Sequence, residues 1–362
     1  MSAIQTNPTR LSRLHEKMVA HQLEALLILN VVNIRYLCGF TGSAGVLLLT
    51  GHDATLFVDG RYTEQAEEQV TGVGAEGAPR PVLPYVLDKR LPSTVKRLGI
   101  EADHVTVAQR RQIQELIPAV ELVHLQRAVE ELRAVKDETE LALMRRAIAI
   151  SDEVFDAFCG WIEPGMTEND VAARLEYEQR LAGGERNASG MTIVASGPRT
   201  SLPHGIATHK RVEAGEPVMI DIGTAVGGYC SDLTRTIHLG TASQAFKELY
   251  QLVYDAQQRA VDDIRAGMTG IEADALAREV IARAGYADNF DHSLAHAIGL
   301  DVHERPFLNP RDSSIIQEHM VFTIEPGVYI PGWAGVRIED VVLVTANGCE
   351  VLTNSNRRLI EL

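Results

Sequence analysis

The chain has 362 residues, of which 45% are hydrophobic and 23% are charged, a composition that is ordinary for a globular enzyme. Its formal net charge of −15 disfavours nucleic acids and anionic membranes as partners. No apolar stretch approaches the ~20 residues of a membrane-spanning helix, and the N-terminal residues lack the apolar core of a signal peptide. Four scattered cysteines without a C-x-x-C spacing fit a reducing compartment, so we expect a cytoplasmic protein.

The first part of the chain alternates short apolar runs with a helical pattern, which is typical of a small α/β domain. The runs at 23–30, 45–50 and 54–59 predict strands, and the pattern at 61–70 predicts a helix. We place this N-terminal α/β domain at residues 1–131.

A long amphipathic helix is expected near the start of the second domain, which we place at residues 132–362. Asp137 and Glu140 are three residues apart, in the pattern of a capping box, which predicts a helix N-terminus. Apolar residues then recur at helical spacing from Leu141 onward, so one face of this helix is expected to be buried.

The second domain contains a faint internal repeat. GMTENDVAARLEYEQRLAGG begins at Gly165 and GMTGIEADALAREVIARAGY begins at Gly267, and each predicts a turn followed by an amphipathic helix. Each is followed by a predicted strand pair that carries two acidic residues, at nearly the same interval. The four acidic residues are Asp221, Asp232, Glu325 and Glu339. The pattern indicates two duplicated halves.

The position of each turn decides how the acidic residues meet. A turn at 226–227 would place Asp221 directly opposite Asp232 on one face of the first hairpin, with Cβ atoms ~4.5–5.5 Å apart. A three-residue turn in the second hairpin would do the same for Glu325 and Glu339. Two unit charges 4 Å apart repel by about 4 kcal/mol at an effective dielectric of about 20. Cations or trapped protons relieve such repulsion, so we interpret the four carboxylates as metal ligands.

A simpler interpretation of these acidic residues is also open. Either aspartate could face solvent or pair with Arg235 or Arg337. Thr234 and Thr236 alternate on the same face as Asp232 and could hydrogen-bond its carboxylate, although they are equally well explained as ordinary β-branched strand residues.

Histidines add nitrogen donors to this acidic set. His292, His296 and His303 lie close together between the two predicted hairpins, and His204 with His209 lies before the first. Their spacing is not the H-E-x-x-H of zincins. Four carboxylates and one histidine make an oxygen-rich set, which suits two Mn²⁺, Co²⁺ or Zn²⁺ ions better than a thiolate-type structural zinc site.

Six motifs in order, SLPHG, MIDIG, SDLTRT, HAIGLDVHE, TIEPGVY and VRIED, resemble those of the creatinase/prolidase-type metallopeptidases. Xaa-Pro aminopeptidases and Xaa-Pro dipeptidases (prolidases) are the most similar members. LEALLILNVVNIRYLCGFTG and LFVDGRYTEQA are similar to the N-terminal domain of that family, so the resemblance covers nearly the whole chain. It implies an α/β N-terminal domain followed by an α+β pita-bread catalytic domain with an internal pseudo-twofold repeat.

The resemblance also implies a role for each candidate site residue. The metal ligands would be Asp221, Asp232, His296, Glu325 and Glu339. The substrate-binding residues would be His204, His292, His303 and Arg337. The catalytic residues would be His204, His303 and Glu325, the last as proton shuttle. Two divalent ions, Mn²⁺ in the first place and Co²⁺ or Zn²⁺ as alternatives, would share a hydroxide that attacks the scissile carbonyl.

One departure from the family pattern is visible beside the candidate histidine ligand. The usual GHGIG reads AHAIG here, with Ala295 and Ala297 in place of glycines. We expect the two added methyl groups to narrow the pocket or shift His296, and so to affect substrate preference more than metal binding.

The expected function is that of an Xaa-Pro aminopeptidase, which removes the N-terminal residue from proline-containing peptides. One alternative is an Xaa-Pro dipeptidase, which must also hold the free carboxylate of the proline. A further alternative, a peptide-binding protein of the same fold without catalysis, is disfavoured because such relatives lose ligands and this chain keeps all five. The resemblance also implies a homodimer.

Overall fold

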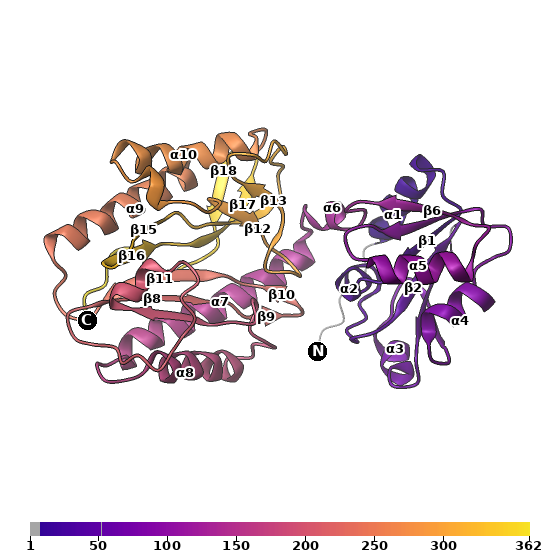
Figure 1. Cartoon of the computed structure of the whole chain (residues 1–362), viewed down its shortest axis with the longest axis horizontal. Coiled ribbons are helices and arrows are strands. Elements are labelled where there is room, and N and C mark those ends of the chain that lie inside the picture. Colours follow the sequence, from indigo (N-terminus) through magenta and orange to yellow (C-terminus); the bar gives the residue numbers. More distant parts are fainter. Residues whose placement is uncertain (1–7, 52) are drawn as a thin grey trace. The chain divides into compact units, whose positions relative to one another are not determined.

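The structure, a computed structural model, describes residues 8–51 and 53–362. The chain divides into two compact units, Met1–Arg133 and Ala134–Leu362, and each has its own sheets and hydrophobic core (Figure 1).

The N-terminal unit is an α/β domain built on one six-stranded sheet, in the order β4-β3-β2-β1-β5-β6. β1 pairs antiparallel with β2 and parallel with β5, so the sheet is mixed. Its strands are β1 (Ala25–Ile28), β2 (Val46–Thr50), β3 (Asp53–Val58), β4 (Gly74–Gly77), β5 (Arg97–Glu101) and β6 (Glu121–Leu125). Its helices are α1 (Pro8–Ala20), α2 (Val31–Cys38), α3 (Thr63–Gln69), α4 (Val82–Lys89), α5 (Val107–Leu116) and α6 (Glu130–Arg133). The strands predicted from the three apolar runs and the predicted helix correspond to β1, β2, β3 and α3, so these predictions are confirmed.

Four long helices frame the C-terminal unit. They are α7 (Glu138–Trp161), α8 (Glu168–Leu181), α9 (Gln244–Asp263) and α10 (Gly270–Arg283). Asp137 caps α7 in a capping box with Glu140, as predicted. Thr167 and Thr269 cap α8 and α10 in the same way, because each hydroxyl accepts from the main-chain N–H three residues on. α8 and α10 both have 14 residues, which supports the duplication seen in the sequence.

The strands of the C-terminal unit form a three-stranded sheet β11-β8-β7, a five-stranded sheet β13-β12-β14-β17-β18 and two short ribbons, β9–β10 and β15–β16. The first half contributes β7 (Ile193–Ser196), η1 (Gly197–Ser201), β8 (Pro217–Ile222), β9 (Ala225–Val226), β10 (Tyr229–Cys230) and β11 (Leu233–His238). The second contributes η2 (Ala287–Asn289), β12 (Ala295–Ala297), β13 (Glu304–Leu308), β14 (Val321–Ile324), β15 (Gly327–Ile330), β16 (Ala334–Arg337), β17 (Asp340–Thr345) and β18 (Gly348–Val351).

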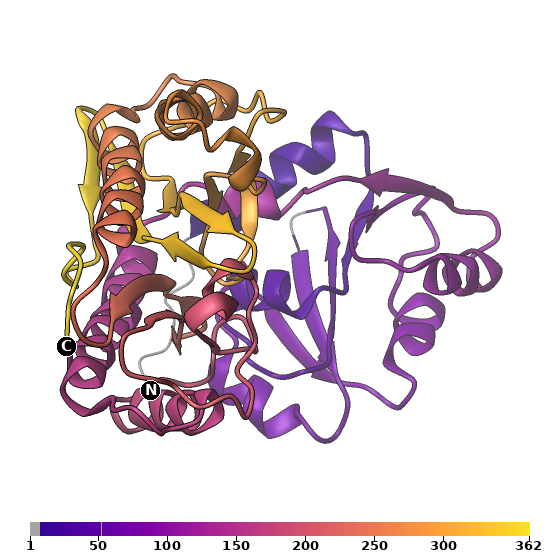
Figure 2. The same ribbon diagram turned by 60° about the vertical axis from the view of Figure 1, so that its left-hand side comes forward.

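Each half of the C-terminal unit has its own core. Phe155 and Phe158 of α7 and Val171 of α8 pack with residues of β7, β8 and β11. Val253 of α9 and Ala277 of α10 pack with residues of β12, β14 and β17. Each helix pair therefore packs on the strands of its own half, and Figure 2 shows the four helices at the outside of the unit around the strands.

The register of the first hairpin differs from the prediction. Val226 pairs with Tyr229, and Asp221 pairs with Thr234 rather than with Asp232. The turn is Gly227–Gly228, where both residues have positive φ (58° and 84°), as the tight primed hairpin turn requires. The direct opposition of Asp221 and Asp232 is therefore wrong. Asp232 lies just before β11, where its side chain is not set by the ladder.

The second hairpin has the predicted register. Ile330 pairs with Ala334 across a three-residue turn centred on Gly332. Ile324 of β14 pairs with Asp340 of β17 in the same register. Glu325 and Glu339 are the next residues toward the turn, so they face one another just beyond the end of the β14–β17 pairing. Within residues 8–51 and 53–362, no helix combines the length and apolar character needed to cross a membrane.

Candidate metal centre

The five predicted ligands all lie at or near strand ends in the middle of the C-terminal unit. Three carboxylates lie beyond the strand ladders: Asp232 precedes β11, Glu325 follows β14 and Glu339 precedes β17. Asp221 lies on β8 and His296 on β12. Because the chain leaves the regular ladder at three of these positions, their side chains can turn toward a common point.

Four of the five side chains are in direct contact. Asp232, His296 and Glu339 each offer one ligand atom, and these three atoms lie within 4.8 Å of one another. His296 Nε2 is 3.7 Å from Asp232 Oδ2 and 3.4 Å from Glu325 Oε1. Asp221 instead forms an ion pair with Arg337, with 2.7 Å between Oδ2 and Nη2. The simpler interpretation of an aspartate–arginine pair thus applies to Asp221.

Burial and mutual repulsion raise the pKa values of three of these acids. Burial raises the pKa of Asp232 well above its ordinary value, and the charges of Glu339 and Asp221 raise it further. Burial and the charge of Glu339 do the same to the pKa of Glu325. The pKa of Glu339 rises to about 8, through burial and then the charge of Asp221. A set of clustered carboxylates that resists ionisation fits divalent cations, because positive charge removes the repulsion.

His296 is held in the form that binds metals. Its Nδ1 lies 3.1 Å from the carbonyl oxygen of Ala297, which can only accept, so Nδ1 carries the proton and Nε2 presents a lone pair to the carboxylates. Burial and the neighbouring His303 lower the pKa of His296 to about 3, so the ring is neutral at physiological pH. Neutral imidazole is the ligand form of histidine.

Threonines orient two of the carboxylates. The hydroxyl of Thr234 donates to Glu339 Oε2 over 2.7 Å, rather than to Asp232 as the alternating pattern suggested. The hydroxyl of Thr323 lies 3.3 Å from Glu325 Oε1 and accepts the main-chain N–H of His296 over 3.2 Å. Sequence reasoning missed Thr323, because its role depends on the pairing of β12 with β14.

A second chain of contacts leads from Asp221 to His292. Arg337, which pairs with Asp221, also donates from Nη1 to the hydroxyl of Tyr329 over 2.8 Å. That hydroxyl lies 3.1 Å from His292 Nε2. Burial raises the pKa of Tyr329 to about 12, so the phenol keeps its proton. Burial, with the charge of Arg337, lowers the pKa of His292 to about 4. Two predicted substrate-binding residues are thus joined through a tyrosine.

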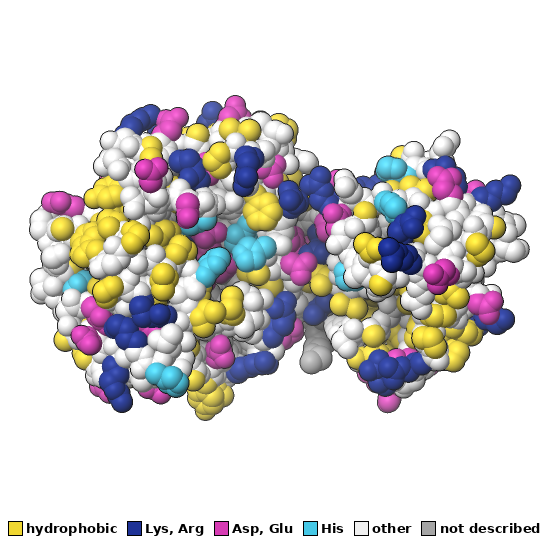
Figure 3. Space-filling model, viewed as in Figure 1, with side chains coloured by type: hydrophobic (Ala, Val, Ile, Leu, Met, Phe, Trp, Pro, Cys, Tyr) yellow, Lys and Arg dark blue, Asp and Glu magenta, His cyan; other side chains and the backbone are white. Residues whose placement is uncertain are grey.

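His303 and His204 lie on the exposed side of the cluster. The ring centroids of His303 and His296 are 4.3 Å apart. Burial lowers the pKa of His303, and the nearby charge of His204 lowers it further, although Asp221 opposes this shift. Figure 3 shows histidine side chains gathered on one face of the C-terminal unit beside acidic side chains. Both histidines can therefore reach a molecule that approaches from solvent.

The loop that carries His204 is fixed by a buried carboxylate. Glu168, at the start of α8, is 0% exposed and accepts hydrogen bonds from the main-chain N–H groups of Ser196 and Thr208. Arg199 adds an ion pair with 3.1 Å between Nε and Oε2. No sequence signal pointed to this role, because Glu168 is an ordinary first-turn residue of a helix and its partners lie on a later loop.

The structure corrects the expectation for the two alanines beside His296. Ala295 and Ala297 are 0% exposed and belong to the hydrophobic core that α9 and α10 cover. The register of β12 shifts between His296 and Ala297, so the positions of the two methyl groups follow from this core packing rather than from simple alternation along the strand. The methyl groups therefore do not narrow the candidate site.

Two family models match the chain. Residues 142–346 match Metallopeptidase family M24, and residues 10–135 match the Creatinase/Prolidase N-terminal domain. The chain is also similar to an Xaa-Pro dipeptidase of Pyrococcus horikoshii, with 38% identity over 352 residues that make up 97% of this chain and 98% of the relative.

Solved structures agree with these matches over the full length. An Xaa-Pro dipeptidase from Bacillus anthracis has a TM-score of 0.95 at 39% identity, covering 98% of this chain and 100% of that one. An X-Pro aminopeptidase from Thermotoga maritima has a TM-score of 0.89 at 37% identity, covering 96% of this chain and 99% of that one. The predicted fold, an α/β N-terminal domain followed by a pita-bread domain, is confirmed.

Proposed function

The chain belongs to metallopeptidase family M24 and is therefore an enzyme, and from this premise we propose that it hydrolyses Xaa-Pro dipeptides. The activities named for the similar proteins support a dipeptidase more strongly than the aminopeptidase expected from sequence. The Bacillus anthracis dipeptidase has the higher TM-score of the two neighbours described above, 0.95 against 0.89. The Xaa-Pro aminopeptidase remains the second candidate because the Thermotoga maritima enzyme is nearly as similar.

One observation carries the proposal of a metal-dependent reaction. The ligand atoms of Asp232, His296 and Glu339 lie within 4.8 Å of one another, and Glu325 Oε1 is 3.4 Å from the same imidazole nitrogen. We propose that these residues, with Asp221, hold two divalent cations. Such cations polarise a carbonyl and lower the pKa of water enough to supply a nucleophile at neutral pH.

We propose Mn²⁺ as the metal of this site. The donor set has four carboxylates and one imidazole, which suits Mn²⁺, with Co²⁺ or Zn²⁺ as alternatives. We keep Mn²⁺ as the first candidate. Measuring the metal content of protein purified without added metal, followed by activity after reloading with each ion, tests it.

Within the proposed site, each side chain has a task that its contacts support. Glu325 is proposed to accept the proton of the attacking water and pass it to the departing proline nitrogen, because its carboxylate lies 3.4 Å from His296 Nε2 within the proposed cluster. His303 and His204 are proposed to orient the scissile carbonyl and to stabilise the negative charge that develops on its oxygen. His292 is proposed to bind substrate, and Arg337 is proposed to act chiefly by holding Asp221.

The chemistry of proline explains why such a site suits Xaa-Pro bonds. The proline nitrogen of an Xaa-Pro bond carries no hydrogen, so an enzyme that grips the amide N–H at the scissile bond cannot hold it. A site that acts on the carbonyl oxygen makes no such demand, and the nitrogen can still be protonated as it leaves. A dipeptidase must also bind the free proline carboxylate with a positive or hydrogen-bonding group, for which His204 is the exposed candidate.

A substrate panel separates the two activities. The Mn²⁺-loaded protein is assayed against Xaa-Pro dipeptides and against Xaa-Pro-Xaa tripeptides with the same first residue. The dipeptidase proposal expects kcat/KM to be higher for the dipeptides. Preference for the tripeptides would favour the aminopeptidase, and hydrolysis of neither would contradict the proposal.

Three broader expectations also remain proposals. We propose a domain division near residues 131 and 132, an assembly as a homodimer and a cytoplasmic location. All four cysteines lie in the described part of the chain and carry free thiols, which supports a reducing compartment. Light scattering on the purified protein gives its mass in solution, and a monomer would contradict the proposed dimer.

A further inference from the structure

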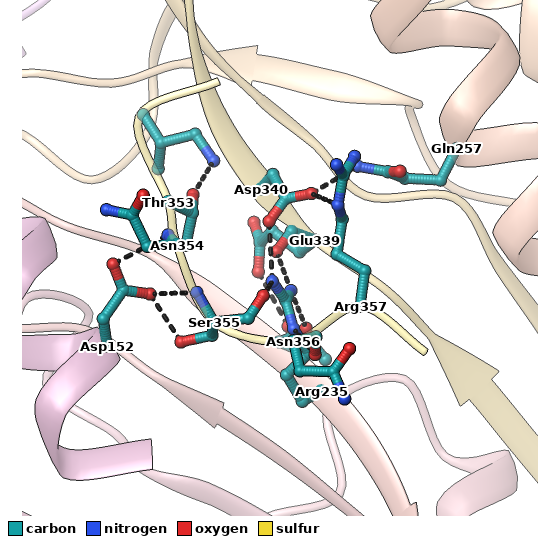
Figure 4. Close-up of polar contacts among 12 residues, drawn as sticks. Asp152, Arg235, Gln257, Glu339, Asp340, Thr353, Asn354, Ser355, Asn356 and Arg357 are labelled. Carbon is teal, nitrogen blue, oxygen red and sulfur yellow. Dashed lines mark hydrogen bonds and ion pairs between the residues drawn. The ribbon is translucent and has the colours of Figure 1, made fainter. Parts of the chain in front are cut away.

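A deeply buried arginine lies behind the proposed ligand Glu339 (Figure 4). The side chain of Arg235 on β11 is 1% exposed, and that of its ion-pair partner Asp340 is 0% exposed, with 2.7 Å between Nη2 and Oδ1. Gln257 of α9 donates to the other carboxylate oxygen over 2.6 Å. Removing two charges from water is costly, so a pair buried this completely calls for a role beyond simple charge pairing.

The guanidinium of Arg235 is fully used. Its Nη2 bonds Asp340, and its remaining N–H groups donate to main-chain carbonyls, those of Thr234, Glu339, Ser355 and Asn356. An arginine has five N–H donors, and each therefore has an acceptor. Lysine could not reproduce this planar arrangement, because its ammonium is a single point of charge with three donors.

These contacts complete the support of one proposed ligand. The carbonyl of Glu339 accepts from Arg235, and the N–H of Glu339 donates to the carbonyl of Thr234 over 3.1 Å. The Glu339 carboxylate accepts from the Thr234 hydroxyl over 2.7 Å. Main chain and side chain of Glu339 are thus both held by β11, a strand of the other half of the unit.

The C-terminal segment 352–357 contacts both Arg235 and Asp152 of α7. Asp152 of α7 accepts from the N–H groups of Asn354 and Ser355, each over 2.9 Å, and from the hydroxyl of Ser355. The carbonyls of Ser355 and Asn356 then accept from Arg235 over 2.9 and 3.0 Å. The segment therefore links α7 to the arginine that holds Glu339 (Figure 4).

We propose that Arg235 is a positioning residue for the metal centre, and that segment 352–357 acts with it by holding the guanidinium in place. Asp340 pairs with Arg235 and, over 3.6 Å, with the partly exposed Arg357, and the contact of Arg235 with Glu339 is to its main-chain carbonyl. The proposed effect of Arg235 on bound cations therefore comes from the position that it gives the Glu339 main chain. The inference rests on the proposed function, because that function makes Glu339 a metal ligand. Loss of a partner that orients a ligand typically weakens metal affinity by 10–100-fold.

The test is calorimetric titration of Mn²⁺ into full-length protein stripped with a chelator. Arg235→Lys keeps a charge beside Asp340 but loses most of the carbonyl contacts. The double variant Arg235→Met/Asp340→Asn removes both buried charges, so no unpaired carboxylate stays buried, and Arg357, which loses its contact with Asp340, is 28% exposed. Phe158→Leu, in the core of the first half and 0% exposed, is the matched control for general destabilisation.

Both Arg235 variants are expected to bind Mn²⁺ at least about tenfold more weakly than wild type. Phe158→Leu is expected to lower the melting temperature and leave the affinity unchanged. Asp152→Ala, which frees the C-terminal segment, is expected to weaken affinity in the same direction. Unchanged affinity in folded Arg235→Lys, or an equal loss in Phe158→Leu, would overturn the inference. If the double variant does not fold, Arg235→Lys alone decides.

Wild-type protein separates this inference from the proposed function. If the wild type does not bind Mn²⁺, Co²⁺ or Zn²⁺, the metal site itself is wrong and the inference falls with it. If the wild type binds and the Arg235 variants bind equally well, the site stands and only the positioning role is refuted.

Discussion

The Thr234 hydroxyl donates to Glu339 Oε2 over 2.7 Å, and it also accepts a hydrogen bond from Arg337 Nε over 3.0 Å. Thr234 belongs to the first half of the C-terminal unit, and the other two residues belong to the second. Arg337 in turn binds Asp221 of the first half. The Thr234 hydroxyl therefore orients both the proposed ligand Glu339 and Arg337, which binds the proposed ligand Asp221. These contacts link the two halves of the unit.

Thr234→Val is expected to weaken metal binding while leaving the fold intact. The substitution removes the donor to Glu339 and the acceptor for Arg337, and such partners are worth about 10–100-fold in metal affinity. Titration of Mn²⁺ into the stripped variant measures the change. Thr234→Ser keeps the hydroxyl and serves as the control, with near wild-type affinity expected. Equal affinity in the valine and serine variants would contradict this role.

Asp232→Asn and Glu339→Gln are each expected to abolish turnover and to reduce the metal content. Each removes a carboxylate that we propose to bind metal directly, so the loss should exceed the roughly 10–100-fold effect of an indirect partner. Activity on Xaa-Pro dipeptides and elemental analysis of the same samples provide the two readouts. A variant that keeps both its activity and its metal would rule out the proposed ligand set.

The stripped protein is expected to lose stability as pH rises from about 7 to about 8. The folded-state pKa of Glu339 is about 8 against an ordinary 4.5, so between these values only the folded state keeps the proton and its stability falls as pH rises. Above about 8 the carboxyl is ionised in both states, and Glu339 contributes no further loss. Asp232 and Glu325 shift in the same direction. The histidines with lowered pKa are neutral in both states over this range and do not contribute. The expected loss is about 1 kcal/mol per pH unit for each group that titrates.

Thermal melts with and without Mn²⁺ test this dependence on pH. Bound cations prefer the ionised carboxylates, so added Mn²⁺ should reduce or reverse the fall in melting temperature as pH rises. The substitution Glu339→Gln should make the melting temperature of the stripped protein less dependent on pH. A melting temperature that does not change with pH in stripped wild type would show that the carboxylates are not clustered as described.

His303→Gln is expected to lower kcat without lowering the metal content. His303 lies beside His296 and is proposed to contact substrate, and loss of one donor to a developing oxyanion typically costs about 10²–10³ in kcat. Kinetics on a dipeptide and elemental analysis together separate this result from that of a ligand variant. A matching loss of metal would assign His303 to the ligand set instead.

Ala297→Gly is expected to lower the free energy of unfolding and to leave substrate preference unchanged. The methyl group lies in the hydrophobic core behind β12, and a glycine inside a regular element costs roughly 0.5–1 kcal/mol relative to alanine. The free energy of unfolding and the ratio of kcat/KM for two dipeptides with small and large first residues are the measurements. A changed ratio would place the methyl group in the substrate pocket after all.

Local features of the fold could be predicted because they depend on neighbours in sequence. The capping box of Asp137 and Glu140 and the matching helices α8 and α10 follow from patterns within a few residues. The register of the second hairpin could also be predicted from sequence, because its strands are joined by the three-residue turn Pro331, Gly332 and Trp333. These predictions needed no knowledge of distant contacts.

The first hairpin and the supports of the site show where such reasoning failed. The Gly227–Gly228 pair is itself a signal for a tight primed turn, but the turn was placed one residue too early, which shifted every opposing residue. The pairing of Asp221 with Arg337, and the roles of Thr323 and Glu168, depend on contacts between segments far apart in the chain. No local pattern encodes them.

The division of the ligands has a consequence for the origin of this catalytic unit. Asp221 and Asp232 come from one half, while His296, Glu325 and Glu339 come from the other. A primitive protein made of a single half would have carried about two carboxylates, too few to enclose a cation, and would have needed a second copy of itself to complete the cage. Fusion of two such copies into one polypeptide would then have allowed the sequences to diverge, so that one copy acquired an imidazole while the other kept only acids.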